Sequence, residues 1–346
     1  MEWGKFTMMK IPKYFESEWH LVALSNDIKI GKAIGRKVIR TPIVIFRSKS
    51  GLSALVDRCP HRNYPLSEGR IIKDTIECPY HGWRFRFDGQ CEDVPGCKLD
   101  DKSKERLKAQ PVSVIEKHGG IFVCLSEPVS EEPKFPEFFG DSKYDHFWWK
   151  QGVWKGSSFD AIENVLDPFH TKFIHNGFIR KRDKHMPVTL QVNSYEKSIE
   201  MVIEQKRSDL GIMARALEWK KRECSRTHYY APTTVQARWE GKQELILCVT
   251  AFFSPQDDFS FRPFACFTTP KGLAPAWLKE VLIRLFLFQV VKQDKEALAK
   301  QSDIIQSFNA PRYTQGPGDI LGNRVHKLYV NKHLEPEQDQ PVEANL

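Results

Sequence analysis

The sequence predicts an α+β protein of two domains, in which a small all-β domain precedes a larger domain of helices and strands. Three observations support this. The chain has 346 residues, more than one hydrophobic core usually organises. Short strand-like runs fill residues 19–126, whereas helical stretches flank the later strands. A segment rich in proline and acidic residues, residues 127–137, separates the two parts.

We place the first domain at residues 14–127 and the second at residues 128–346, with residues 1–13 free to pack with the second. In the first domain, runs such as Trp19–Leu24 and Gly120–Leu125 alternate with glycine and charged turns, as in all-β domains. The second domain is expected to contain a helix, a run of strands, a long helix and a frayed polar tail, at about residues 158–173, 188–267, 275–307 and 335–346.

The formal charge of +8 is spread along the chain without a basic run interleaved with aromatic residues. This favours a solvated basic surface over nucleic-acid binding, with docking of an acidic electron-transfer protein as the alternative. The first residues lack a signal-peptide pattern. The strongest apolar stretch, Val281–Val291, contains Arg284 and is too short to span a bilayer. We therefore expect a cytoplasmic protein without a membrane span, and a buried helix at residues 281–291.

Eight cysteines are present, and a disulfide framework is not expected in a cytosolic chain of this size. Cys124, Cys248 and Cys266 lie in apolar strand-like runs and are expected to be core residues. Cys59 and Cys78 differ, because each is followed closely by a histidine.

These two Cys–His pairs are the strongest functional signal in the chain. Cys59-Pro-His61 is followed, after sixteen intervening residues, by Cys78-Pro-Tyr-His81, and each pair follows a strand-like segment. Two thiolates and two imidazoles can hold a zinc ion or a [2Fe–2S] cluster. Because each loop carries one ligand of each kind, both cysteines can bind one iron and both histidines the other. A structural zinc remains the alternative.

A second set of candidate ligands lies in the helical stretch. Asn164, Asp167 and His170 share one face of an ideal helix, whereas His175 is about 140° away from His170. Both histidines can bind one metal only if the helix ends, bends or carries a π-bulge between them, and Pro168 favours a local break. Two histidines and one carboxylate would form the facial triad of non-haem Fe(II) oxygenases.

The long C-terminal helix offers the carboxylate. Asp294 lies on its apolar face, where burial without a partner is costly and a metal is a natural partner. An ion pair with a basic residue, or a helix rotated to expose Asp294, are the alternatives. Asp303 is the main rival on the same helix, and Glu296 lies among polar positions.

Together these segments resemble Rieske non-haem iron oxygenases, the aromatic-ring-hydroxylating terminal oxygenase components. The resemblance covers essentially the whole chain and is thin in the middle strands. At Asn63 the family often has glycine. Four segments carry the resemblance: Cys59-Pro-His61-Arg62 with Leu66-Ser67-Glu68-Gly69, Cys78-Pro-Tyr-His81-Gly82-Trp83, Glu163-Asn164-x-x-Asp167-x-x-His170-x4-His175, and Gln293-Asp294-Lys295-Glu296.

The resemblance implies an all-β Rieske [2Fe–2S] domain followed by a helix-grip-like α+β catalytic domain with a mononuclear Fe(II). It implies that Asp167, next to Asn164, connects a Rieske histidine of one subunit to His170 of a neighbour in a head-to-tail ring, most often a homotrimer. The implied ligands are Cys59 and Cys78 for one cluster iron, His61 and His81 for the other, and His170, His175 and Asp294 for the mononuclear iron.

The implied reaction is hydroxylation or oxidative demethylation of a small hydrophobic, aromatic or polycyclic substrate with O2. Electrons would come from NAD(P)H through a reductase, with or without a ferredoxin. Ring cis-dihydroxylation is the alternative reaction. A Rieske electron-transfer or redox-sensing protein and a zinc-stabilised binding domain are the alternative classes. Phe252, Phe253, Phe264 and Phe267 lie where the pocket wall is expected, and core packing is the favoured interpretation for most of them.

Overall fold

The structure is a computed structural model that describes residues 10–180, 182, 187–205, 222–241, 244–272 and 274–346. The chain forms two compact units. One comprises Lys13–Phe135, and the other comprises Pro136–Leu346 together with the described residues before Lys13. Each unit is described by itself.

The N-terminal unit is built from two antiparallel sheets, as the alternation of apolar and polar residues predicts. A six-stranded sheet has the order β1-β10-β9-β4-β3-β2, and a four-stranded sheet has the order β5-β6-β7-β8. The strands are β1 (His20–Leu24), β2 (Lys32–Val38), β3 (Thr41–Arg47), β4 (Leu52–Val56), β5 (Arg70–Ile72), β6 (Thr75–Glu77), β7 (Arg84–Phe85), β8 (Cys91–Asp93), β9 (Pro111–Lys117) and β10 (Gly120–Cys124).

Short helices connect these strands: η1 (Lys13–Ser17), η2 (Ser25–Asp27), η3 (Leu66–Glu68) and α1 (Asp101–Arg106). The apolar faces of both sheets form the core of the unit, and all five residues of β10 are buried. The expected all-β character of this part is therefore confirmed. The four-stranded sheet and the end of β4 place two loops, which carry Cys59 and Cys78.

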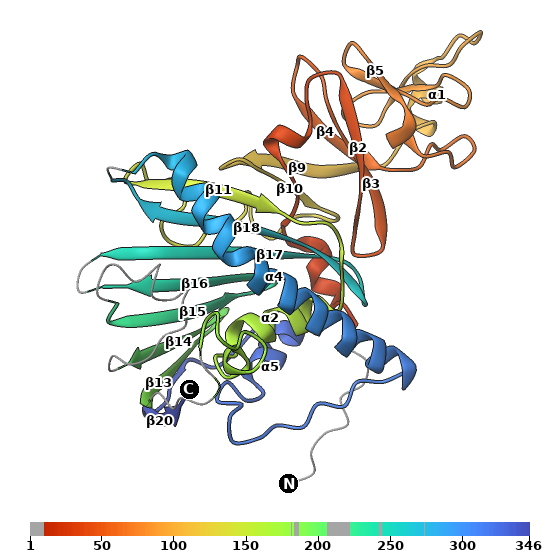
Figure 1. The fold of residues 1–346 in the computed structure, drawn as a ribbon. Coiled ribbons are helices and arrows are strands. Elements are labelled where there is room, and N and C mark those ends of the chain that lie inside the picture. The colour runs from red at the N-terminus through yellow and green to blue at the C-terminus, as the bar shows by residue number, and fades with distance from the viewer. Residues whose placement is uncertain (1–9, 181, 183–186, 206–221, 242–243, 273) are drawn as a thin grey trace. The chain divides into compact units, whose positions relative to one another are not determined.

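The C-terminal unit is one large antiparallel sheet with helices against it (Figure 1). The sheet has the order β11-β18-β17-β16-β15-β14-β13-β19, with β12 beside β18 and β20 beside β13. The strands are β11 (Tyr144–Lys150), β12 (Trp154–Lys155), β13 (Pro187–Tyr195), β14 (Ser198–Gln205), β15 (Cys224–Tyr230), β16 (Thr234–Glu240), β17 (Leu245–Asp257), β18 (Ser260–Pro270), β19 (Glu337–Gln338) and β20 (Val342–Asn345).

Three helices pack against one another and against this sheet: α2 (Ser158–Leu166), α4 (Ala276–Ser307) and α5 (Arg324–Asn331). α2 contacts the central strands β15, β16 and β17, and α5 contacts β14. The functional segment after α2 is thereby held against the middle of the sheet. Phe252, Phe253, Phe264 and Phe267 are buried in β17 and β18, as core packing predicts, and so are Cys248 and Cys266.

Two expectations about this unit were wrong. The apolar stretch 281–291 of α4 is not buried throughout, because it is apolar on more than one side and only one side packs. Ile283 and Val290 are buried, whereas Leu285 is 69% and Phe288 61% exposed. The C-terminal tail is not frayed, because β19 and β20 pair with β13 and bury Leu346. In the described part of the chain, no helix is both long enough and apolar enough to cross a bilayer.

Candidate functional site

The two cysteine loops of the N-terminal unit have the same backbone design. In each loop the cysteine N–H donates to the carbonyl five residues later, and the cysteine carbonyl accepts from the N–H four residues later. The four hydrogen bonds, of 2.8–2.9 Å, are Cys59 N to Tyr64 O, Asn63 N to Cys59 O, Cys78 N to Trp83 O and Gly82 N to Cys78 O. Each loop is therefore closed by its own backbone.

The fourth residue after each cysteine has a left-handed backbone, with φ of 63° at Asn63 and 71° at Gly82. Asparagine is one of the few residues besides glycine that adopt this conformation readily. The departure at Asn63 from the usual glycine therefore keeps the loop geometry. The Asn63 side chain also accepts a hydrogen bond from Arg58 Nε at 2.6 Å.

The side chains of the two loops fit a [2Fe–2S] cluster. Cys59 and Cys78 are free, buried thiols, and burial, with the neighbouring Cys78, raises the pKa of Cys59 to about 11. The rings of His61 and His81 lie 4.5 Å apart, and Trp83 stacks on His61. The buried Nδ1 of His61 has no hydrogen-bond partner among the described residues. Two buried thiols and two neighbouring imidazoles are the donor set that a Rieske cluster uses.

The second candidate site begins where α2 ends. The helix stops at Leu166, seven residues before the expected end at residue 173, and Asp167 already has an extended backbone. The expectation that Asn164, Asp167 and His170 share one helix face was therefore wrong. Pro168 cannot donate a helical hydrogen bond, and the Asp167 carboxylate instead accepts from the N–H groups of Phe169 (2.7 Å) and His170 (3.1 Å).

This break brings the two histidines together with the carboxylate of the long helix. His170 begins the short helix η4 (His170–Lys172), and His175 lies three residues beyond it. Asp294 Oδ1 is 3.0 Å from His175 Nε2 and 3.7 Å from His170 Nε2. One ligand atom from each of the three residues lies within 4.8 Å of the others.

The outer ring nitrogens of both histidines are held by oxygen acceptors. His170 Nδ1 lies 2.7 Å from the Asp167 carbonyl oxygen, and His175 Nδ1 lies 2.9 Å from Gln293 Oε1. Each Nδ1 therefore donates to its oxygen acceptor, and each Nε2 points to the side of Asp294, where its lone pair would bind a shared metal. Sequence reasoning missed Gln293 as a partner, and only its place beside Asp294 could have drawn attention to it.

The rival carboxylates lie elsewhere on α4. Asp303 is exposed and pairs with Lys155. Glu296 is exposed, and Lys292 Nζ lies 3.9 Å from its carboxylate. Among these three acids the structure brings only Asp294 to the histidine pair.

A cavity of about 250 Å³ opens beside the two histidines and Asp294. It is lined by apolar side chains from α2, from the segment after α2, from the sheet and from α4, with four arginines among the polar ones. The apolar lining residues are Val165, Leu166, Pro168, Ile179, Ile203, Ala237, Trp239, Ile246, Leu247, Leu287 and Val290. Such a space beside a metal triad suits a small hydrophobic substrate.

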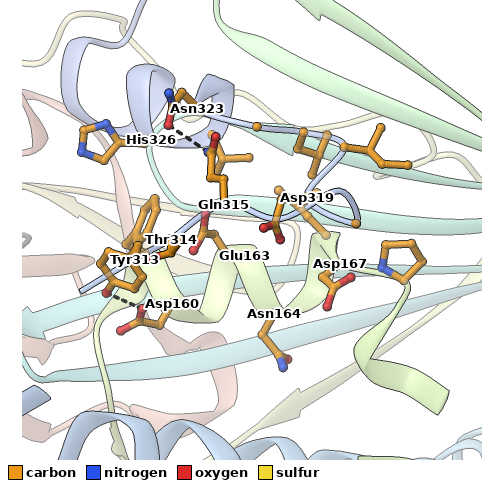
Figure 2. A pocket seen from close by; sticks show the side chains of 18 of the residues that line it. Asp160, Glu163, Asn164, Asp167, Tyr313, Thr314, Gln315, Asp319, Asn323 and His326 are labelled. Atoms are coloured by element: carbon orange, nitrogen blue, oxygen red, sulfur yellow. Dashed lines mark hydrogen bonds between the residues drawn. The ribbon is translucent and has the colours of Figure 1, made fainter. Parts of the chain in front are cut away.

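A second cavity, of about 410 Å³, shares Asn164 and Asp167 with the first and is lined by acidic side chains (Figure 2). Asp160 accepts a hydrogen bond from Tyr313 at 2.8 Å. Burial, together with Asp160, Asp319 and Asp167, raises the pKa of Glu163 to about 8. Asn164 thus lines both cavities, two residues before the end of α2.

Comparison with known proteins matches both parts of the chain to domains of known families. The Rieske [2Fe-2S] domain model matches residues 18–111, and the model of the vanillate O-demethylase oxygenase C-terminal domain matches residues 159–329. The oxygenase component of 3-ketosteroid-9-alpha-monooxygenase from Rhodococcus rhodochrous is 30% identical over 95% of this chain and 80% of that protein. The chain belongs to the Rieske oxygenases.

Other relatives are covered less completely by this Rieske oxygenase. The chain spans 44% of a second 3-ketosteroid-9-alpha-monooxygenase oxygenase component from the same species, at 30% identity over 49% of its own length. It spans 33% of the chloroplastic protein TIC 55 from Arabidopsis thaliana, at 28% identity over 51% of its own length.

Solved structures share the fold of this Rieske oxygenase. NdmA of Pseudomonas putida CBB5 with caffeine has a TM-score of 0.78 at 18% identity, over 95% of this chain and 98% of that one. Dicamba monooxygenase bound to 3,6 dichlorosalicylic acid has a TM-score of 0.77 at 20% identity, over 94% and 97% of the two chains.

Proposed function

We propose that this chain is the terminal oxygenase component of a multicomponent system, which uses O2 and reductase-derived electrons to hydroxylate or oxidatively demethylate a small hydrophobic substrate. The observation that carries the proposal is the convergence of His170, His175 and Asp294 at one end of a largely apolar cavity, in a chain that also holds a Rieske domain. An electron carrier without oxygenase chemistry would need neither the triad nor the cavity.

The proposed ligands divide into two sets. Cys59, Cys78, His61 and His81 would hold the [2Fe–2S] cluster. His170, His175 and Asp294 would hold the mononuclear iron, and the cavity that they line would hold the substrate. Iron bound there supplies the activation of O2.

The protein groups around the triad orient and shield it. The Asp167 carbonyl and Gln293 Oε1 keep the proton on Nδ1 of each histidine and so aim both Nε2 atoms inward. The apolar walls exclude water and hold the hydrophobic body of the substrate next to the metal.

We also propose that Asp167 carries electrons between subunits. Its carboxylate lies at the turn that positions His170, with Oδ2 3.6 Å from His170 Nδ1, and its side chain is 45% exposed. An exposed carboxylate beside a metal ligand is accessible to a Rieske histidine of a neighbouring chain. A head-to-tail homotrimer, a partner reductase and, in some systems, a ferredoxin complete the proposal.

Monooxygenation is favoured over ring dihydroxylation. The names of several relatives describe monooxygenation or demethylation: the 3-ketosteroid-9-alpha-monooxygenase component of Rhodococcus rhodochrous and the dicamba O-demethylase component of Stenotrophomonas maltophilia. Incorporation of one rather than two atoms from ¹⁸O2 into the product distinguishes the two reactions.

Metal analysis tests the proposal directly. The expected content is three irons and two acid-labile sulfides per chain, because a [2Fe–2S] cluster and a mononuclear iron are both present. The reduced protein should also give a rhombic EPR signal. A colourless protein that contains only zinc would overturn the assignment, and two irons with two sulfides would leave an electron-transfer protein.

A further inference from the structure

The cavity beside the metal triad contains more positive charge than an apolar substrate requires. Four arginines line it: Arg180, Arg222, Arg226 and Arg238. Their partners within the protein decide whether this charge is available to a ligand.

Two of the four arginines are neutralised by glutamates of the sheet and of the segment before β11. Arg226 Nε lies 2.9 Å from Glu240, and Arg238 lies 2.7 Å from Glu137 and 3.1 Å from Glu200. Three carboxylates thus surround two guanidinium groups, and these arginines serve the internal charge balance of the sheet.

Arg180 differs from them. Its Nη1 is fully buried and has no hydrogen-bond partner among the described residues, and no described carboxylate lies within ion-pair distance of its guanidinium. Burial and the nearby Arg222 lower the pKa of Arg180 to about 10, with Asp167 acting in the opposite sense. Arg180 therefore stays protonated at neutral pH, and burial of its Nη1 without a hydrogen-bond partner among the described residues is costly.

Two carboxylates that line the same cavity as Arg180, those of Asp167 and Asp294, already have other partners. The oxygens of Asp167 accept hydrogen bonds from the N–H groups of Phe169 and His170. Asp294 faces the two histidines. Among the described residues neither carboxylate forms an ion pair with Arg180, so a negatively charged group of a molecule in the cavity would complete the pairing of this guanidinium.

We infer that Arg180 is a substrate-binding residue and that the substrate is a small hydrophobic compound with a carboxylate. The inference rests on the proposed function of the same site, because the Arg180 ligand would share the cavity with the metal triad. A guanidinium binds a carboxylate through two parallel N–H···O bonds. The apolar walls would hold the rest of the molecule, and the pairing with Arg180 would set its orientation toward the metal.

Arg180 follows His175 by five residues, within the same local structure. The N–H of Gly177 donates to the Arg180 carbonyl at 2.7 Å, and the N–H of Ile179 donates to the His175 carbonyl at 3.1 Å. The segment that places a metal ligand therefore also places the arginine. The same loop would therefore position both the metal ligand His175 and the arginine that would bind the substrate carboxylate.

Ligand binding tests the inference without turnover. The holoenzyme is titrated with three acid–amide pairs of matched shape: benzoate and benzamide, 2-naphthoate and 2-naphthamide, and 4-biphenylcarboxylate and its carboxamide. Dissociation constants are measured by calorimetry at fixed ionic strength. In at least one pair the acid should bind about tenfold or more tightly than its amide, since a desolvated charge pair is strongly favoured over a neutral contact.

Variants assign the preference to its residue. Arg180→Met should bring acid and amide to within about twofold of each other, and Arg180→Lys should retain part of the difference. Arg182→Met is the matched control, because Arg182 is exposed, lies 5.5 Å above the Phe173 ring and does not line the cavity. It should keep the wild-type preference.

Three results overturn the inference: no acid preference in any pair, an unchanged preference in Arg180→Met, or the same loss of preference in Arg182→Met. Iron and sulfide are measured on the same samples, so a failure of the proposed function would appear separately, as missing mononuclear iron. A loss of acid binding in Arg180→Met at full iron content identifies the substrate contact.

Discussion

At the scale of single residues, the candidate iron site depends on a few side chains whose roles are separable. His170, His175 and Asp294 meet within 4.8 Å, and each histidine has a second contact that determines which ring nitrogen faces the metal. The ligands and the groups that orient them can therefore be changed independently.

We predict that Asp294→Ala removes the mononuclear iron and all oxygenation while the Rieske absorbance stays intact. The variant removes the carboxylate that lies beside the Nε2 atoms of both histidines. Iron content per chain and the visible spectrum measure the two effects. Asp303→Ala is the control, because Asp303 is exposed on the same helix. Normal iron binding in Asp294→Ala together with its loss in Asp303→Ala would reverse the assignment.

Gln293→Leu should weaken iron binding at the mononuclear site by about 10- to 100-fold, the usual cost of losing a hydrogen bond to a metal-bound histidine. The amide oxygen that holds His175 Nδ1 is lost, and both ring nitrogens then compete for the proton. Gln293→Glu keeps an acceptor and should retain most of the affinity. Competition with a chromophoric chelator measures the dissociation constant. Equal affinity in Gln293→Leu and wild type would show that the contact does not orient the ligand.

At the scale of elements, two local structures hold the Rieske domain together. The paired cysteine loops are closed by their own backbone hydrogen bonds. The first strand is hydrogen-bonded to η1 through a buried histidine. His20 lies at the start of β1, and its Nε2 donates to the Phe15 carbonyl at 2.7 Å.

Cys59→Ser or Cys78→Ser should abolish the [2Fe–2S] absorbance, because a serine hydroxyl is a poor substitute for a soft thiolate ligand. The exposed Cys97 lies in the same unit outside both loops, and Cys97→Ser should keep the full spectrum. Sulfide analysis of the purified variants provides the measurement. A complete cluster in either loop variant would contradict the ligand assignment.

The stability of β1 should fall between pH 7 and pH 5 because of His20. Burial lowers the pKa of His20 to about 4, against the raising effect of the Phe15 hydrogen bond. Below pH 6.5 the unfolded chain binds a proton that the folded chain does not, so unfolding becomes easier until the folded pKa is reached. The cost at pH 5 is about 2 kcal/mol.

Hydrogen exchange of peptides that cover β1 measures this effect. Wild type should lose about 2 kcal/mol more protection than His20→Gln between pH 7 and pH 5. Parallel pH profiles for the two proteins would assign the acid sensitivity to other groups.

At the scale of the whole molecule, function would require more than one chain. The proposed route of electrons runs from the cluster of one subunit to the iron of the next, through Asp167. If Asp167 transfers electrons and does not bind a metal, its substitution should lower turnover while both metal sites stay occupied.

Asp167→Asn should keep both metal sites and lose about 10- to 100-fold in turnover. Asparagine keeps one oxygen for the N–H groups of Phe169 or His170 but removes the charge. Single-turnover rates of cluster oxidation, with metal analysis, separate electron transfer from iron loss. Asp319→Asn, in the wall of the second cavity (Figure 2), serves as the control. Wild-type rates in Asp167→Asn, or full activity in a strict monomer, would refute the route between subunits.

The sequence by itself predicted the candidate ligands and the order of an all-β part before a part with helices and a large sheet. Cys59-x-His61 and Cys78-x-x-His81 lie on short loops closed by local hydrogen bonds. Their candidate ligands can therefore be predicted from the local sequence alone. Pro168, whose missing N–H predicted a local break, lies two residues after the end of α2, but the helix ends before His170 and not between the two histidines. The strands and the long helix followed from hydrophobic periodicity, which reports which residues face a core.

Only the tertiary structure decided contacts between distant segments. Gln293 meets His175 across 118 positions of the chain, and Arg180 faces the metal cavity although no local pattern marks it. The tail forms strands because β13 offers it a free edge, and α4 leaves apolar residues exposed because only one of its sides packs. The periodicity of apolar residues predicts which side chains favour burial, whereas the packing of the whole fold determines which residues they contact.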